Sequence, residues 1–144
     1  MNRRLTYRPL LPYDARNLEK LVGAVQATDI FNRVNDPDIA CWAVVCVEAL
    51  SKGERIRGVI QYEFFSESGH NTIDYVYVQP SLRRKRIGSA LVSTVLSIEA
   101  GTSFARVPVA SEFLCPQKFF ASCGYKGTEE DDTYQFVREP PVSE

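Results

Sequence analysis

The spacing of apolar residues along the first part of the chain predicts a strand followed by a helix. Leu5 to Arg8 is a short extended segment, and apolar residues then recur at helical spacing over Pro12 to Val25. Asp14 stands near the start of that helix, where a carboxylate meets unpaired amides and the positive end of the helix dipole. The polar, poorly periodic stretch from Thr28 to Pro37 is typical of a loop or a short helix.

Three successive segments rich in Val, Ile, Tyr and Phe follow, and each has the length of a strand. They run from Ala40 to Ala49, from Arg55 to Phe65 and from Thr72 to Val78, and the turns between them are short. We therefore expect an antiparallel meander. After Pro80 the spacing changes again, and apolar residues from Ile87 to about Glu99 lie on one face of a helix.

The last part of the chain predicts a strand at Phe104 to Ala110, a short helix at Pro116 to Cys123 and a strand at Thr133 to Val137. The acidic run Glu129 to Asp132 is interpreted as a solvated turn between two final strands. A strand, a helix and a further strand imply a parallel pair in an otherwise antiparallel sheet. The expected fold class is therefore mixed α/β: one domain over residues 1–139 with a central, mostly antiparallel sheet flanked by helices, and a flexible tail over 140–144.

Composition fits one soluble domain with one core and narrows the range of partners. The chain has 144 residues, is 44% hydrophobic, and sets 17 Lys and Arg against 18 Asp and Glu. A net charge of -1 argues against nucleic acid and membrane surfaces as partners, and the longest apolar run, Ile39 to Val47, is too short to cross a bilayer. The spacing of the four cysteines matches no zinc or redox motif, so we expect reduced thiols, no metal and a cytoplasmic location.

One segment has the chemistry of an anion site. The strand ending at Val78 leads into a turn with four consecutive cations, Arg83 to Arg86, which opens directly onto the helix that begins near Ile87. Amides of a first helical turn and the helix dipole both favour an anion, while Gly88 and Ser89 keep side-chain bulk low. A solvated charge run or a nucleic-acid patch are the alternatives, but the position between strand and helix favours a cradle for phosphate or pyrophosphate.

The same segment resembles a known family signature. The run Val78-x-Pro80-x-x-Arg83-x-x-Arg86-Ile87-Gly88-Ser89-Ala90-Leu91 resembles the acetyl-CoA-binding pattern V-x-P-x-x-[RQ]-x-x-G-x-[GA]-x-x-L of the GCN5-related N-acetyltransferase (GNAT) superfamily. The predicted element order is similar to that fold, and Gly124-Tyr125 stands where the family usually has Gly-Phe. The resemblance covers most of the chain, with its specific part between Val76 and Leu91.

This resemblance implies acetyl-CoA as cosubstrate and a place for each part of it. The strand of Thr72 to Val78 would splay from the strand of Phe104 to Ala110, and Val76 and Val78 would contact the pantetheine arm. A backbone amide near Val76 would polarise the thioester. The residues implied at the phosphates are Arg83, Arg84, Lys85, Arg86, Ile87, Gly88 and Ser89, and those implied beside the pantetheine are Phe119 and Phe120.

Three positions depart from the family pattern. Arg86 replaces the first glycine of the signature, Phe113 stands where the family often has Asn, and Phe120 stands where it often has a Tyr that protonates the departing thiolate. Phenylalanine cannot donate a proton. The proton would then come from water, Ser122 or Tyr125, unless the protein is catalytically weak.

Asp74 is the first candidate for the general base, because it is the acid on the strand that precedes the signature. Strict alternation places it with Thr72, Val76 and Val78 on one face of the sheet, opposite Ile73, Tyr75 and Tyr77. A carboxylate among valines would have a raised pKa, which suits a base at neutral pH. A solvated or Arg-paired carboxylate is the alternative, with Glu63 the second candidate base and Glu112 the third.

These expectations combine into one functional hypothesis with one alternative. The protein would move an acetyl group from acetyl-CoA to a primary amine of a small molecule or a protein by direct attack; the alternative is an acyl-CoA-binding or interaction module of the same fold without catalysis. The resemblance implies that Thr28 to Ile39 and the loop near Glu129 to Asp132 shape the acceptor site. The acidic loop favours a cationic acceptor, and a homodimer is left open.

Overall fold

Thirteen elements follow one another in a computed structural model that describes residues 4–83, 86–99, 101–108, 116–130 and 133–140. The tail expected over 140–144 lies, apart from Pro140, outside the described residues. In chain order the elements are β1 (Leu5–Pro9), the 3-10 turn η1 (Pro12–Asp14), α1 (Ala15–Val22), α2 (Ala24–Val34), β2 (Cys41–Leu50), β3 (Gly53–Phe65), β4 (His70–Val78), the 3-10 turn η2 (Pro80–Leu82), α3 (Ile87–Ile98), β5 (Ser103–Pro108), α4 (Pro116–Ser122), β6 (Lys126–Glu130) and β7 (Thr133–Arg138).

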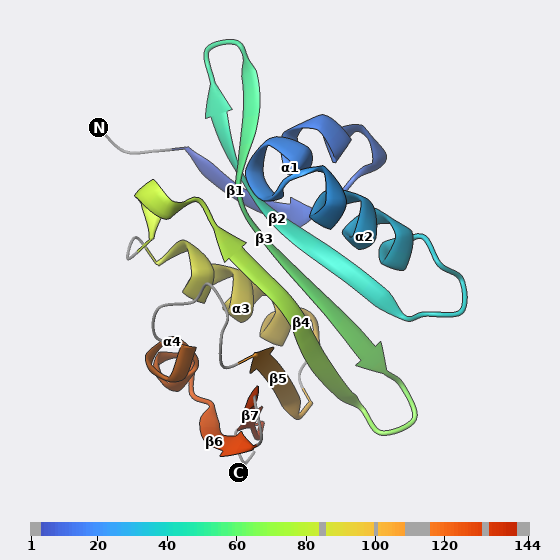
Figure 1. Cartoon of the computed structure of the whole chain (residues 1–144), viewed down its shortest axis with the longest axis vertical. Coiled ribbons are helices and arrows are strands. Elements are labelled where there is room, and N and C mark those ends of the chain that lie inside the picture. The colour runs from blue at the N-terminus through green and yellow to red at the C-terminus, as the bar shows by residue number, and fades with distance from the viewer. Residues whose placement is uncertain (1–3, 84–85, 100, 109–115, 131–132, 141–144) are drawn as a thin grey trace.

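The strands form one sheet in the order β1-β2-β3-β4-β5-β7-β6 (Figure 1). The β4–β5 pair is parallel, and the other neighbouring strands are antiparallel. Helix α3 forms the connection between β4 and β5, as a parallel crossover requires. The mixed, mostly antiparallel fold class predicted from the sequence is therefore confirmed.

Helices cover both faces of this sheet (Figure 1). On one face α1 and α2 bury Leu18, Ala27 and Ile30 against β2 and β3. On the other face α3 and α4 bury Leu91, Val95 and other apolar residues against the sheet. Among the described residues, no helix is long and apolar enough to cross a membrane.

The predicted N-terminal helix is interrupted, and the segment after it is more helical than expected. Gly23 ends α1 and separates it from α2. Its φ is 92°, a positive value that glycine adopts without strain. Helix α2 extends to Val34, into the stretch interpreted as a loop or short helix. Its buried residues Ala27 and Ile30 are three positions apart, which is a helical spacing. Polar residues surround them in the sequence, so the helical pattern is weak.

Asp14 precedes α1 but does not cap it through its side chain. Its two carboxylate oxygens accept hydrogen bonds of 2.7 and 2.9 Å from Arg8, and the Leu11 amide donates to it at 2.8 Å. Burial raises the pKa of the Asp14 carboxyl, but the Arg8 hydrogen bonds, the Leu11 amide and the Arg8 charge outweigh burial and lower the pKa overall. The residue therefore ties β1 to the start of the helical layer.

The last strand, β7, begins at Thr133 as predicted and ends one residue beyond the predicted Val137, but the acidic segment before it differs from the prediction. Glu129 and Glu130 belong to β6, so the acidic turn is shorter than the run Glu129 to Asp132, and residues 131–132 lie outside the described part of the chain.

Strands β4 and β5 diverge. Their register joins Asn71 to Ser103, Thr72 to Phe104 and Ile73 to Ala105, and stops there. The pairing of β4 with β3 continues to Val78, while β5 continues along β7. The splay implied by the family resemblance is therefore present.

A buried polar network holds the paired ends of β4 and β5. The Ser103 hydroxyl donates to the Asn71 side-chain oxygen at 2.6 Å and also lies 2.6 Å from the Tyr125 hydroxyl, which then donates to it. All three residues are buried. The network links β4, β5 and the start of β6 across the closed end of the splay.

Candidate active site

Arg86 immediately precedes α3 in a left-handed conformation, with φ of 66° and ψ of 13°. It is the one non-glycine residue with positive φ among those the structure describes. This is the signature position at which the resembling family has glycine, and glycine is the residue that adopts this conformation without steric cost. In this chain an exposed arginine adopts the conformation that glycine would adopt more readily.

The first turn of α3 offers backbone amides to an anion. The Ala90 amide donates to the Arg86 carbonyl at 3.0 Å, which is the bond that starts the helix. Amides that precede Ala90 have no acceptor inside the helix, and the dipole adds positive potential. A twelve-residue helix with Arg86 at its entrance suits a phosphate group there. Arg84 and Lys85, expected at the same place, lie outside the described residues.

Gly88 lets α3, α4 and the end of β4 approach closely. A Cβ at this position would lie 2.8 Å from Phe119 Cε1 and 3.6 Å from Val78 Cγ2. The next residue, Ser89, accepts a long contact of 4.0 Å from the Cys123 thiol. The low bulk of Gly88 therefore accommodates the Phe119 ring of α4.

The two phenylalanines of α4 have different environments. Phe120 is 1% exposed and packs against Tyr125 and Phe136 in the core. Phe119 is partly buried and meets the edge of α3 at Gly88. Phe119 is therefore the better placed of the two to contact a ligand.

Arg83 lies against β4. Its Nε donates to the Val78 carbonyl at 3.1 Å, and its guanidinium carbon is 5.3 Å from the centroid of the Tyr77 ring. The Tyr77 and Tyr75 rings are stacked in parallel, 6.4 Å between centroids. In this structure the Arg83 side chain therefore covers the end of the splayed strand.

A β-bulge in β4 overturns the predicted face of Asp74. Gln61 pairs with Tyr75 and Tyr62 pairs with Ile73, so Asp74 is an extra residue opposite β3. Ile73 consequently shares the buried α3 face with Val76. Asp74 lies off that face: part of its residue surface is exposed to solvent, while its carboxyl group is desolvated beside Glu63 and Arg33. The alternation that placed Asp74 with Val76 and Val78 is wrong because it assumed an uninterrupted strand.

The structure brings the first two candidate bases together. Burial of its carboxyl group and the neighbouring Glu63 carboxylate raise the pKa of Asp74 to about 7, while Arg33 acts in the opposite direction. Arg33 lies 3.7 Å from Glu63 and 3.5 Å from Asp29, both measured between nitrogen and oxygen. The raised pKa agrees with the sequence-based prediction. The predicted cause was a set of surrounding valines, whereas in the structure the causes are burial and the neighbouring Glu63. Glu112 lies outside the described residues.

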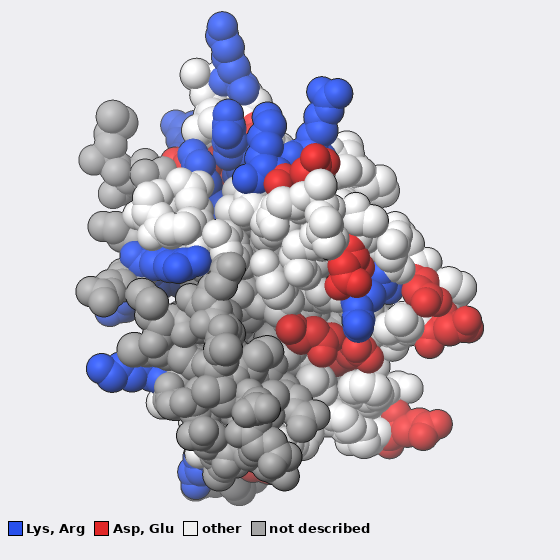
Figure 2. Space-filling view, viewed as in Figure 1, with Lys and Arg blue, Asp and Glu red and all other residues white. Residues whose placement is uncertain are grey.

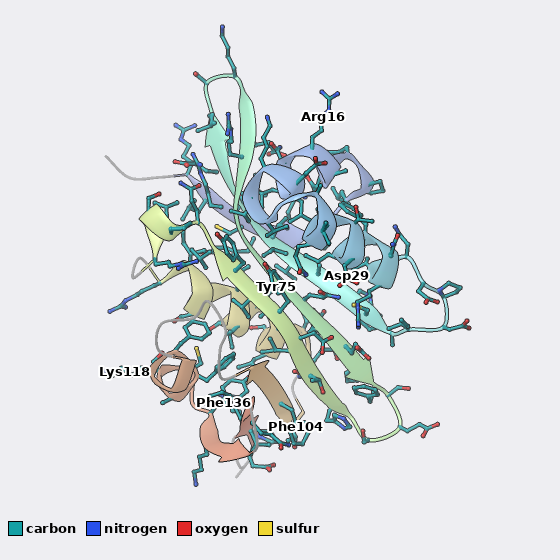
Figure 3. The ribbon with its side chains drawn as sticks, viewed as in Figure 1. Arg16, Asp29, Tyr75, Phe104, Lys118 and Phe136 are labelled. Atoms are coloured by element: carbon teal, nitrogen blue, oxygen red, sulfur yellow. The ribbon has the colours of Figure 1, made fainter. Side chains whose placement is uncertain are left out.

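Helix α2, which the sequence predicted only as a loop or a short helix, supplies one wall of the site. Asp29 and Arg33 lie one turn apart on α2, and Figure 3 shows Asp29 beside the sheet that carries Tyr75. Asp and Glu side chains gather on this side of the molecule (Figure 2). The signal for this helix in the sequence was the helical spacing of Ala27, Ile30, Phe31 and Val34, which pack on one core cluster.

Both side chains considered as alternative proton donors are already engaged. The Tyr125 hydroxyl is held by Ser103, and burial is the largest cause of its raised pKa. The Ser122 hydroxyl donates to the Phe119 carbonyl at 2.6 Å. Phe113 lies outside the described residues.

The sheet splays between β4 and β5, and the N-terminus of α3 follows the splayed strand after one short turn, which is the arrangement that the family resemblance implied. The sequence matches the family model described as "Acetyltransferase (GNAT) domain" over residues 37–127. That match covers more than half of the chain, and the chain belongs to this family. No curated protein sequence matches it significantly.

Solved structures show the same fold at low sequence identity. The PaiA N-acetyltransferase of Thermoplasma acidophilum, in complex with coenzyme A, has a TM-score of 0.74 at 11% identity, over 94% of this chain and 99% of that one. A putative GNAT acetyltransferase of Desulfovibrio desulfuricans has a TM-score of 0.72 at 14% identity, over 93% and 96%. The dodecameric spermidine N-acetyltransferase of Vibrio cholerae has a TM-score of 0.69 at 14% identity, over 94% and 93%.

Proposed function

We propose that this protein transfers the acetyl group of acetyl-CoA to a primary amine by direct attack. The observation that carries the proposal is the divergence of β4 from β5 next to the N-terminus of α3. Membership of the acetyltransferase (GNAT) domain family supports it, and so does the likeness to the PaiA enzyme, whose structure contains coenzyme A.

The splayed strand and the helix entrance suit the two halves of the cosubstrate. A pantetheine arm is an extended amide chain, and such a chain binds to the edge of a strand, here Val76 to Val78. The diphosphate would lie on the amides of Ile87 to Ser89, and Phe119 would flank the arm. Arg83 would have to leave the Val78 carbonyl wherever the arm takes that contact.

Acetyl-CoA supplies an acyl group activated as a thioester. The carboxylate pair of Glu63 and Asp74 takes a proton from the acceptor ammonium, directly or through water, and a pKa of about 7 suits that step at neutral pH. The amine nitrogen then forms a bond to the carbonyl carbon as the carbon–sulfur bond breaks, and it loses its second proton to water to leave the neutral amide. A backbone amide near Val76 stabilises the charge on the carbonyl oxygen.

The departing thiolate takes its proton from water in this proposal. The family resemblance implies that Phe120 stands at the usual position of the donor, and its ring is buried against Tyr125 and Phe136. A thiol has an ordinary pKa of about 8.5, so the thiolate is a competent leaving group without a protein acid.

The surroundings of the carboxylate pair favour a cationic acceptor. The carboxyl groups of Asp29, Glu63 and Asp74 outnumber the one cation beside them, Arg33, so the site carries net negative charge even when Asp74 is protonated. Spermidine N-acetyltransferase of Vibrio cholerae, whose name gives a polycationic acceptor, shares the fold. The proposed acceptor is therefore an amine on a cationic small molecule or a lysine-rich peptide.

The test measures thiol release from acetyl-CoA with spermidine, a lysine peptide and an aminoglycoside. Activity with at least one acceptor is expected, and Asp74→Asn should lower kcat by about 10²-fold or more while acetyl-CoA binding persists. Glu67→Gln, a carboxylate change in the exposed β3–β4 turn, is the control and should leave the rate unchanged.

A non-catalytic acyl-CoA-binding module is the second candidate. It is favoured by Phe120 in place of a proton donor and by Arg86 in place of the signature glycine. Tight acetyl-CoA binding without turnover of any acceptor would support this candidate and reject the enzyme.

A further inference from the structure

A cationic pocket lies between α1, β3 and the chain that leaves β4. It encloses about 180 Å³ and is lined by polar side chains that include Asn17, Lys20, Arg55, Arg57 and Gln79. Carboxylates are not among its lining residues. Lys and Arg side chains gather at this end of the molecule, over the β2–β3 hairpin and α1 (Figure 2).

We propose that this pocket binds a small oxyanion, a phosphate or carboxylate group. Arg57 is neutralised by Glu48, with 2.7 Å between Nε and Oε1, whereas Lys20 and Arg55 make no ion pair within the described residues. The adjacent carboxylate, that of Glu54, is bound by Arg8 at 3.1 Å. Two positive charges therefore face one hollow without a counter-ion from the described chain.

Arg57 is a positioned donor rather than a mobile surface cation. Its Nε is fixed by Glu48, its Nη1 donates to the Gln79 side-chain oxygen at 2.8 Å, and Gln79 in turn donates to Ser81 at 2.8 Å. The Arg57 side chain is 17% exposed. The N–H groups of Nη2 are left to bind an anion. Because the guanidinium is already held in place, binding would cost little further side-chain entropy.

Size and position separate this pocket from the proposed acetyl-transfer site. At about 30 Å³ for each water, the volume equals about six waters, enough for one phosphate group. Gln79 follows Asp74 by five residues, about 16 Å along an extended chain, so one small group cannot contact both. The pocket also lies on the α1 side of the sheet, and α3 lies on the other side.

The experiment is a titration of the whole protein with inorganic phosphate at constant ionic strength, followed by amide NMR. Saturable shifts are expected around Lys20, Arg55 to Arg57 and Gln79. The double variant Lys20→Gln with Arg55→Gln should weaken binding about tenfold, the effect of losing two partly exposed charge contacts.

A matched pair of charge changes outside the pocket provides the control. Arg16, on α1 (Figure 3), and Lys52, in the β2–β3 turn, are exposed and do not line the pocket. The double variant Arg16→Gln with Lys52→Gln should leave the phosphate affinity within twofold of the parent. Equal weakening by both double variants, shifts confined to Arg86 to Ser89, or the absence of saturable shifts would each overturn the proposal.

The source of the oxyanion is resolved by comparing CoA with dephospho-CoA. If the pocket holds the 3′-phosphate of CoA, the Lys20 and Arg55 variant weakens CoA binding and leaves dephospho-CoA binding unchanged. If it holds a separate anion, the variant affects phosphate binding alone. Both results support an oxyanion site, and neither measurement depends on acetyl transfer, so this proposal and the proposed function can fail independently.

Discussion

Arg86 holds its backbone in a conformation that costs a residue with a Cβ about 1–2 kcal/mol. The strain persists because the turn must end β4 and begin α3 within a few residues. In return for this strain, Arg86 places a positive charge at the start of α3, where the cation and the helix dipole both favour a bound anion.

Replacing Arg86 by glycine should stabilise the fold. We expect Arg86→Gly to raise the free energy of unfolding in urea by about 0.5–1 kcal/mol, because relief of strain exceeds the added entropy of the unfolded chain. Arg86→Ala loses the same charge but keeps the Cβ, and should not stabilise. Equal stability of the two variants would show that charge, not backbone geometry, governs this position.

The Glu63 and Asp74 pair predicts the pH dependence of the proposed reaction. Because the pKa of Asp74 is raised to about 7, the rate should rise with pH through about 7 as the base ionises. Glu63→Gln removes the neighbouring charge and should move the midpoint to lower pH. A midpoint that stays in place in kcat/KM profiles of Glu63→Gln would exclude the pair as the titrating base.

The same pKa has a stability consequence with a definite sign. The folded-state pKa lies above the unfolded value of about 3.9, so the folded state binds the proton more tightly and loses stability as pH rises from about 4 through about 7. Asp74→Asn should remove that part of the pH dependence. Urea denaturation between pH 4 and 8 measures it.

Asp74 shows how far a single residue can be read from sequence. The strand and the acid within it could be selected by pattern, and the direction of the pKa shift followed from burial. Its orientation could not, because a bulge at one position changes the face of every residue on one side of it. Likewise, no local pattern in the sequence shows that Glu63 and Asp74 contact each other across neighbouring strands, so the sequence offers them only as alternatives.

The link between β1 and the helical layer depends on one buried ion pair. Asp14 is 1% exposed and is bound by Arg8 and by the Leu11 amide. Asp14→Asn should lower the free energy of unfolding by about 2–3 kcal/mol at pH 7, because it leaves Arg8 with one partner fewer in a half-buried place.

Acid should have the same effect as that substitution. The pKa of Asp14 is lowered, so its stabilisation is complete above the ordinary carboxyl value of about 3.9 and is lost as pH falls below it. Glu54→Gln changes the exposed partner of Arg8 and should cost less than about 1 kcal/mol. Equal costs for the two variants in chemical denaturation would refute the buried-pair account.

For most helices and strands, the sequence predicts the type of element better than the residues at which it begins and ends. The meander strands and α3 have long, strongly periodic patterns and were located within a few residues. Helix α2 is only partly predicted, as a loop or a short helix, because polar residues separate the four apolar positions that pack on the core, Ala27, Ile30, Phe31 and Val34. The break at Gly23 depends on a positive φ.

The whole molecule consists of two parts of one sheet joined by a short seam. Strands β1 to β4 and strands β5 to β7 meet through the pairing of Asn71 to Ile73 with Ser103 to Ala105. The buried network of Asn71, Ser103 and Tyr125 strengthens this seam. The parallel topology was predictable from element order, but the polar network was not, because its members are far apart in the chain.

Removing the central hydroxyl of the seam should loosen the C-terminal part first. Ser103→Ala leaves two buried polar groups without their partner and should cost about 2–3 kcal/mol. Hydrogen exchange should then accelerate in β5 and β7 more than in β2 and β3. Ser97→Ala, which removes an exposed hydroxyl bound to the Ser93 carbonyl, should change stability by about 0.5 kcal/mol or less. Uniform acceleration across all strands would contradict a weak seam.

The divergence of β4 from β5 also bears on colloidal behaviour. Among the described strands, none pairs with β4 beyond Ile73 on the β5 side, and apart from the Val78 carbonyl bound by Arg83 this is the kind of backbone edge that templates pairing between chains. An extended ligand lying along Val76 to Val78 would occupy that edge as an additional strand does. Under the proposed function, bound CoA would therefore block pairing between protein molecules at this edge. Concentrated protein without ligand should self-associate more readily than protein kept with CoA.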